Sequence, residues 1–305
     1  MRKLVFALGA SVALVLSSVG ATSAASPPSN DEPSGALPLT PGVSIDFDST
    51  DATAGTTDPT NCNGSNGSFP GPYYASIWFS YTATAKDRIL YVDAPTTQGD
   101  PKDFLAITFV FAQTTGGLQL IDCRAYGDDA SWRATPGTTY LIMVAGLDTS
   151  VTGEPDLSDR GGHGTITLFQ VAGQTLTRTF NFADTFDFGC PNVNLTETFS
   201  VQDRVTMLFS TNGTIVRIDD HGTFSGVITN LDTGQTYRDP GHTLNRFDVK
   251  TGVFSQVGLI YNITIPGQGV VALDVGFISF DPSGNVVIHG PHQVFNGLDL
   301  CVVLG

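Results

Sequence analysis

The sequence predicts an all-β protein, with an N-terminal β-sandwich that is jelly-roll-like, followed by a second antiparallel β-barrel or barrel-like sandwich. Apolar and polar residues alternate with a period of two in many short segments, as in strands with one buried face. Clusters of Gly, Pro, Asn and Asp separate these segments at short intervals. After residue 25, no segment carries the apolar stripe of an amphipathic helix.

The first 25 residues have the pattern of a secretory signal peptide. Arg2 and Lys3 precede an apolar run over residues 4–19, and small residues follow at 21–25, so cleavage fits after Ala24 or Ala25. The alternative is a retained membrane anchor, which is disfavoured because the run is shorter than the ~20 residues of a membrane span. We therefore expect a secreted, extracellular protein with no membrane insertion after processing.

The chain is strongly acidic. Its formal net charge is -15, and loss of the two positive charges of Arg2 and Lys3 lowers the charge to -17. A negative field repels phosphate backbones and anionic headgroups, so nucleic acid and membrane surfaces are disfavoured as partners. Only 14% of the residues are charged, which favours a compact fold over a disordered acidic tail.

We expect a linker over residues 26–41, rich in Pro and Ser, and a β-sandwich over residues 42–172. In this module every second residue of the segment 77–81 is a large apolar or aromatic one, namely Ile77, Phe79 and Tyr81. This period of two, which directs one row of side chains inward, recurs in later segments. The later segments are 105–111, 140–144 and 166–168, with turn clusters at 114–117 and 135–138.

The second module is expected over residues 173–305, because one series of strands ends at Val171 and another begins at Thr175. Turns are predicted at 231–235 and at 281–285, and in the second of these Pro and Gly supply the required φ angles. Roughly eight to ten strands would suit a closed barrel or a barrel-like sandwich, and closure would remove exposed edges. The strands expected are 177–182, 198–201, 205–209, 214–218, 223–230, 257–265, 271–280 and 286–289.

The chain has four cysteines, which allow three disulfide pairings. The division into two modules favours Cys62 with Cys123 and Cys190 with Cys301. Zinc binding through these thiols is the alternative, but no CxxC spacing is present to support it.

The order of signals from Asn30 to Val171 resembles the bacterial pre-peptidase C-terminal domain. The matching pieces are Asn30-Asp31-Glu32 with Ala36 and the segments 76–81, 123–129, 135–146 and 164–168. The resemblance implies a non-catalytic β-sandwich that serves in secretion, anchoring or substrate contact. Here the module comes first and no peptidase accompanies it, so the resemblance implies a free-standing binding module. The second module is similar to uncharacterised β-rich domains of secreted bacterial proteins, from which no activity can be carried over.

Two candidate sites fall in the first module. Oxygen ligands on adjoining loops suit calcium, and the residues expected to supply them are Asn30, Asp31, Glu32, Asp128 and Asp129. The alternative is an acidic turn beside a solvated arm, since no EF-hand loop is present. Aromatic side chains at Tyr73, Tyr74 and Trp132, with Trp78 and Tyr126, would form a platform for sugar rings or protein. Core packing is the alternative, and it is strongest for Trp78.

We predict no catalytic residue and no cofactor other than possible calcium. No His-Glu-x-x-His motif and no G-x-S-x-G elbow occur, and His289 and His292 flank a Gly-Pro turn that would separate their rings. Residues 219–222, Asp-Asp-His-Gly, could orient a general base but are more typical of a hairpin turn.

The sequence therefore predicts a secreted binding or adhesion protein that contacts an extracellular protein or polysaccharide. One alternative is a carrier of a small hydrophobic ligand in the C-terminal barrel. Another is a hydrolase or isomerase whose site is dispersed over the C-terminal barrel.

Overall fold

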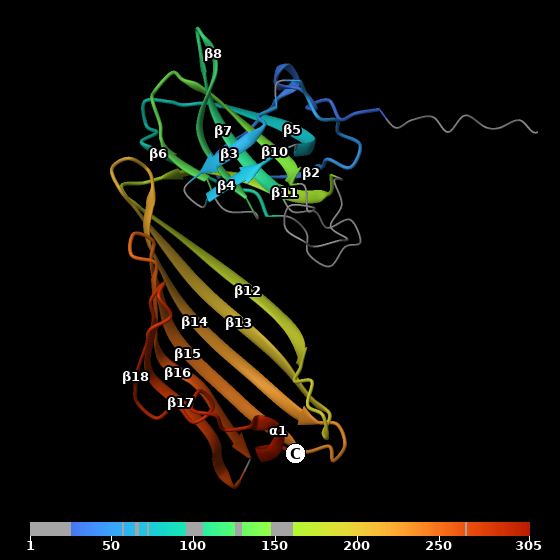
Figure 1. Cartoon of the computed structure of the whole chain (residues 1–305), viewed down its shortest axis with the longest axis vertical. Helices are drawn as coiled ribbons and strands as arrows, with labels where there is room; N and C mark the ends of the chain where they lie inside the picture. Colours follow the sequence, from blue (N-terminus) through green and yellow to red (C-terminus); the bar gives the residue numbers. More distant parts are fainter. Residues whose placement is uncertain are drawn as a thin grey trace, which may run out of the picture.

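The computed structural model describes residues 26–56, 58–64, 67–71, 73–95, 106–125, 130–147, 161–265 and 267–305. Nearly all regular structure in these residues is β-strand, which confirms the all-β prediction. A sandwich of two sheets precedes a single long curved sheet (Figure 1). Within the described ranges, no helix has the length and apolarity that a membrane span requires.

The described residues of the sandwich form eleven strands in two main sheets and a small hairpin, preceded by a 3-10 turn at Pro33–Gly35. The first sheet has the order β1-β5-β10-β7-β8, with strands Leu37–Pro38, Tyr73–Thr82, Thr139–Leu147, Ala106–Thr114 and Gly117–Ala125. The second sheet has the order β2-β11-β6-β9, with strands Ser44–Asp48, His163–Val171, Ile89–Asp93 and Ala130–Arg133. The hairpin pairs β3 (Asn61–Gly64) with β4 (Gly67–Pro70).

Strand β5 shows how the alternating sequence builds the sandwich core. Ile77 and Phe79 point between the two sheets, where Phe79 packs against Phe47 of β2 with ring centroids 6.1 Å apart. Trp78 points to the opposite face and joins a second cluster with Phe111. Because both faces of the first sheet are buried, this strand is almost continuously apolar.

The second cluster contains the Cys62–Cys123 disulfide, which joins the β3–β4 hairpin to β8. This pairing confirms the prediction made from the division into modules.

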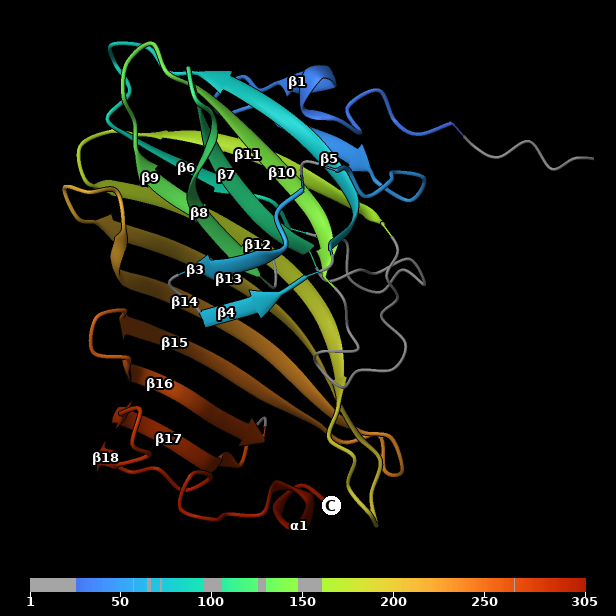
Figure 2. The same cartoon turned by 45° about the horizontal axis from the view of Figure 1, so that its top comes forward.

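The second module is one seven-stranded antiparallel sheet in simple up-and-down order (Figure 2). Its strands are β12 (Thr175–Asp187), β13 (Leu195–Phe209), β14 (Ile215–Asn230), β15 (Thr236–Asp248), β16 (Val253–Ile265), β17 (Gly269–Phe280) and β18 (Val286–His289). The turn predicted at 281–285 joins β17 to β18, with Gly284 at φ +80°. The turn predicted at 231–235 joins β14 to β15.

Of the two forms expected for this module, the closed barrel is not formed, because the described strands leave β12 and β18 as two separate edges of an open sheet. β12 has 13 residues and β18 has only 4, so the two edges are too unequal in length to pair along their course. The sheet curves strongly but stays open along one side (Figures 1 and 2).

The hairpin turn predicted at 219–222 is also wrong. These residues lie in the middle of β14 and pair with β13 on one side and β15 on the other. Asp219 forms ion pairs with Arg217 at 3.1 Å and Arg246 at 2.7 Å, which explains how a run of charges fits within a strand.

The two modules are joined by an apolar cluster and by an ion pair whose arginine is partly buried. Tyr91 of the sandwich packs against Phe209 of β13 with centroids 6.1 Å apart. Arg178 of β12 pairs with Asp93 and lies over the ring of Phe169. The end of the curved sheet where β12 begins is therefore fixed against the sandwich.

The other end of the concave face is covered by the C-terminal segment, residues 290–305, which includes the short helix α1 (Leu300–Val303). The Cys190–Cys301 disulfide fastens this segment, as predicted. The Leu304 carbonyl accepts hydrogen bonds from Asn230 Nδ2 (3.1 Å) and the Tyr237 hydroxyl (2.9 Å). Between the sandwich and this segment, none of the described residues covers the middle of the concave face.

Candidate functional site

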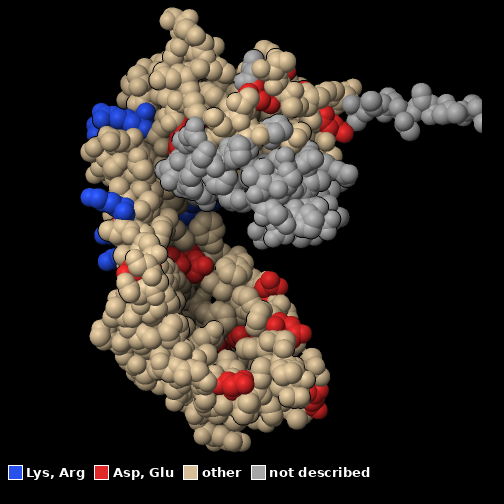
Figure 3. All heavy atoms as spheres, in the orientation of Figure 1, with Lys and Arg blue, Asp and Glu red and all other residues tan. Residues whose placement is uncertain are grey.

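A groove of about 530 Å³ occupies this uncovered part of the concave face. In Figure 3 the hollow lies below the sandwich, with Asp and Glu side chains around it, while Lys and Arg gather toward the opposite edge of the molecule. Strands β12 to β16 all contribute lining residues, which include Phe199, Phe224 and Tyr261 together with the carboxylates of Asp184, Glu197, Asp203 and Asp220.

The groove is hollow because glycines occupy several inward positions of the two central strands. Gly222 and Gly226 of β14 alternate with Phe224, and Gly241 of β15 is the register partner of Phe224. A Cβ at Gly226 would lie 1.9 Å from Glu197 Oε1, and one at Gly241 would lie 3.0 Å from the Leu259 carbonyl oxygen. Side chains at these positions would fill the space that the groove occupies.

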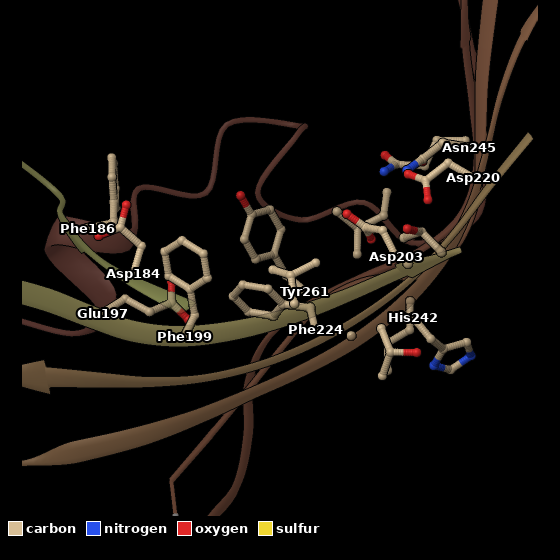
Figure 4. A pocket seen from close by; sticks show the side chains of 18 of the residues that line it. Asp184, Phe186, Glu197, Phe199, Asp203, Asp220, Phe224, His242, Asn245 and Tyr261 are labelled. Carbon is tan, nitrogen blue, oxygen red and sulfur yellow. The ribbon is translucent and has the colours of Figure 1, made fainter. Parts of the chain in front are cut away.

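The middle of the groove has an aromatic floor formed by Phe199, Phe224 and Tyr261 (Figure 4). The rings of Phe199 and Phe224 lie 5.4 Å apart, and Phe182 of β12 extends the row at 6.2 Å from Phe199. The three floor residues are only half-buried, so they present apolar surface to whatever enters the groove.

A carboxylate pair, Glu197 and Asp239, lies at the end of the groove nearest the C-terminal segment. Glu197 of β13 leans over Gly226, whose register partner on β15 is Asp239. Glu197 is 6% exposed and Asp239 is 0% exposed. Glu197 Oε1 and Asp239 Oδ2 receive no hydrogen bond from the described residues, whereas Asp239 Oδ1 accepts one from the Asn262 N–H at 2.9 Å.

Asp239 is placed by an irregularity in the ladder between β15 and β16. The register shifts between Arg238 and His242, where Pro240 also lacks an N–H to donate. At this register shift the carboxylate of Asp239 accepts a hydrogen bond from the backbone N–H of Asn262. A bulge of this kind re-aims side chains, and here it buries an acid behind the groove wall.

Burial makes the pair difficult to ionise. Burial, and secondarily the charge of Asp239, raise the pKa of Glu197 from 4.5 to about 7. Burial raises the pKa of Asp239 from 3.8 to about 6, although the hydrogen bond from Asn262 opposes this shift. Burial and the nearby carboxylates of Asp239, Glu197 and Asp274 raise the pKa of the Tyr261 hydroxyl. The pair therefore titrates near neutral pH, where a positive charge beside it would favour ionisation.

A second acidic cluster lies at the end of the groove nearest the sandwich (Figure 4). Asp203 and Asp220 come from β13 and β14, and Asn245 Nδ2 donates to Asp220 Oδ2 at 3.1 Å. Burial, followed by the charge of Asp220, raises the pKa of Asp203.

The chemistry of the groove is one-sided. Its described lining offers carboxylate acceptors and aromatic rings, but no Lys or Arg. His242 contributes to the wall, but its ring lies on the other side of the sheet from the aromatic floor (Figure 4). Such a lining can hold an apolar body and stabilise a positive charge, whereas an anion would be repelled.

Two of the calcium ligands predicted in the first module, Asn30 and Asp31, make hydrogen bonds within the sandwich module. The Asn30 side chain donates to the Trp78 carbonyl oxygen at 3.1 Å, and both carboxylate oxygens of Asp31 accept from Thr53 at 2.6 Å. Glu32 lies beside Gly55. Asp128 and Asp129 lie outside the described residues, so calcium at that pair stays a prediction. The described part of the chain contains no group of three or more His, Cys, Asp or Glu residues that could hold a metal ion.

The aromatic platform predicted in the first module is wrong for two of its residues. Tyr73 is 2% exposed and Trp132 is 3% exposed, because both pack into the sandwich clusters. Tyr73 stacks edge-on against Phe109 at 5.0 Å, and Trp132 lies 5.3 Å from Tyr140. Tyr74 is half-buried. Trp78 is buried, as its core alternative predicts, and Tyr126 lies outside the described residues.

The rings of His289 and His292 do not converge, as predicted from the Gly-Pro turn between them. His292 Nε2 lies 3.3 Å from the His289 carbonyl oxygen, and the ring of His289 stacks on Phe277. His221 is exposed on β14, so it is not part of the groove.

Sequence reasoning missed Glu197, Phe199, Phe224, Asp239 and Tyr261. One signal was present, because residues 220–228 alternate as Asp, Gly, Phe, Gly and Ile at every second position. A strand with glycine at alternate inward positions indicates a hollow rather than a filled face.

Comparison of the chain with protein-family models, with curated proteins and with solved structures finds no match.

Proposed function

We propose that the protein is a secreted, non-catalytic binding protein whose groove holds a small ligand with an apolar body. The observation that carries this proposal is the half-exposed aromatic floor within a groove whose neighbouring inward positions are glycine. The volume of about 530 Å³ falls within the range of small-molecule sites. The two disulfides are typical of proteins that fold in an oxidising compartment.

A small ligand is favoured over a polysaccharide at this groove. The sandwich bounds one end of the concave face and the C-terminal segment bounds the other, so a compact molecule fits between them more readily than an extended polymer (Figure 1). In the sandwich, burial of Tyr73 and Trp132 removes two of the three residues expected to contact a polymer or protein. Contact of the sandwich with an extracellular protein or polysaccharide remains a prediction.

A neutral fluorescent probe tests the proposal. N-phenyl-1-naphthylamine brightens when it leaves water for an apolar site, so its emission should rise and saturate as protein is added. The double variant F199A/F224A should weaken probe binding by about tenfold or more, because it removes two rings from the contact surface.

The matched control is V227A, which shortens an exposed side chain of the same strand that lies outside the groove lining. It should bind the probe as the unchanged protein does. Absence of binding, or equal affinity in F199A/F224A, would refute the proposed function.

A further inference from the structure

We infer that the groove selects organic cations, namely amines or quaternary ammonium compounds whose apolar body lies on the aromatic floor and whose positive headgroup lies beside Glu197 and Asp239. This inference rests on the proposed function, since it names the class of ligand that the same groove takes.

The first step concerns charge balance within the groove. Four carboxylates line it, and Asp239 lies just behind Glu197. No Lys or Arg of the described chain lines the groove, and the described residues form no ion pair with Glu197, Asp203 or Asp239. Buried carboxylates are normally paired, so a ligand that brings a positive charge would supply the missing partner.

The second step concerns free hydrogen-bonding capacity. Glu197 Oε1 and Asp239 Oδ2 are buried without a donor among the described residues, and Glu197 lines the groove. If Glu197 and Asp239 were both protonated, this end of the groove would suit a neutral apolar ligand. The opposite end, however, also carries carboxylates, those of Asp203 and Asp220. The field is therefore negative along the whole floor.

The third step concerns the rings. Phe199, Phe224 and Tyr261 lie between the two acidic ends, and their faces attract cations through the ring quadrupole. Aromatic surface flanked by carboxylates is the arrangement that recognises an ammonium group with attached carbon atoms. A fatty acid would bring a further negative charge to a lining that has no Lys or Arg among the described residues.

The experiment compares three compounds that share one apolar body and differ in the headgroup. These are 4-phenylbutyltrimethylammonium, 4-phenylbutanol and 4-phenylbutyrate, each titrated against bound N-phenyl-1-naphthylamine at pH 8. We expect the cation to displace the probe at a concentration about tenfold lower than the alcohol, and the anion to be the weakest.

Two variants locate the headgroup. E197Q removes the charge at the proposed end and should abolish the preference for the cation while the neutral probe still binds. D203N removes a charge at the opposite end of the groove and should leave most of the preference intact.

The outcomes separate the two proposals. Equal affinity for cation and alcohol, with the probe still bound, would overturn cation selectivity and leave the proposed function standing. Loss of the preference in D203N but not in E197Q would overturn the placement beside Glu197. Failure of the probe and all three compounds to bind would refute the proposed function and cation selectivity with it.

Discussion

Replacing Glu197 with Gln should stabilise the second module at alkaline pH. The glutamate is 6% exposed and its Oε1 accepts no hydrogen bond from the described residues, so little is lost when the charge is removed. Its pKa is raised from 4.5 to about 7, which corresponds to roughly 3 kcal/mol of unfavourable free energy once the group is ionised.

The sign follows from proton linkage. The folded protein binds the proton of Glu197 more tightly than the unfolded chain does, so this group lowers stability as the pH rises from about 4.5 to 7. E197Q lacks this titration. The difference in unfolding free energy should be near zero at pH 4 and should reach about 1 to 3 kcal/mol in favour of the variant at pH 8, after allowance for the buried amide.

The assay is urea unfolding followed by far-UV circular dichroism between pH 4 and 8. Trp78 and Trp132 both lie in the sandwich, so tryptophan fluorescence reports that module separately. D46N removes a charge from exposed Asp46 in β2 and is the matched control. A difference that does not change with pH, or a variant less stable than the unchanged protein at pH 8, would refute the reasoning.

Three further changes probe the same architecture. G226A should displace the Glu197 carboxylate, because the new Cβ would lie 1.9 Å from Glu197 Oε1. The variant should therefore bind N-phenyl-1-naphthylamine about tenfold more weakly. Unchanged binding would show that the groove adapts freely. Replacing Cys190 and Cys301 with Ser should destabilise the second module by about 2 to 4 kcal/mol in urea, while the Cys62 and Cys123 double variant should affect the sandwich transition instead. R178A removes the ion pair with Asp93 and the contacts with Phe169 and Phe180. Small-angle scattering should then show a broader distribution of distances between the two modules. A scattering curve identical to that of the unchanged protein would contradict a role of Arg178 in fixing the modules together.

The sandwich was the more predictable half of the protein. Its core strands are short and apolar on one or both faces, so Ile77, Phe79 and Ile166 could be placed from their alternation alone. The two disulfides followed from the division into modules. Exposure was harder to judge, because the outer face of the first sheet is covered by the β3–β4 hairpin, and this cover buries Tyr73.

The second sheet was less predictable because polar residues run through its long strands. β15 was missed entirely, since Asp239, Pro240 and Gly241 interrupt any apolar pattern. Charges at Asp203 and Asp219 suggested ends of strands, yet one lies in the groove and the other pairs with two arginines on the opposite face.

The carboxylate pair could not be found from the sequence. Glu197 and Asp239 are far apart in the chain and meet only because β13, β14 and β15 pair in a register that brings both to Gly226. That register is fixed by the buried residues at the end of the sheet, such as Leu195, Ile228 and Tyr237.

The most direct measurement is a carboxyl carbon NMR titration of Glu197, carried out with and without 4-phenylbutyltrimethylammonium. In the free protein the Glu197 signal should titrate with a pKa of about 7, and saturation with the cation should lower that pKa by about one unit or more. A pKa near 4.5 in the free protein, or a pKa that the bound cation leaves unchanged, would contradict a buried carboxylate that serves as the counterion of a ligand.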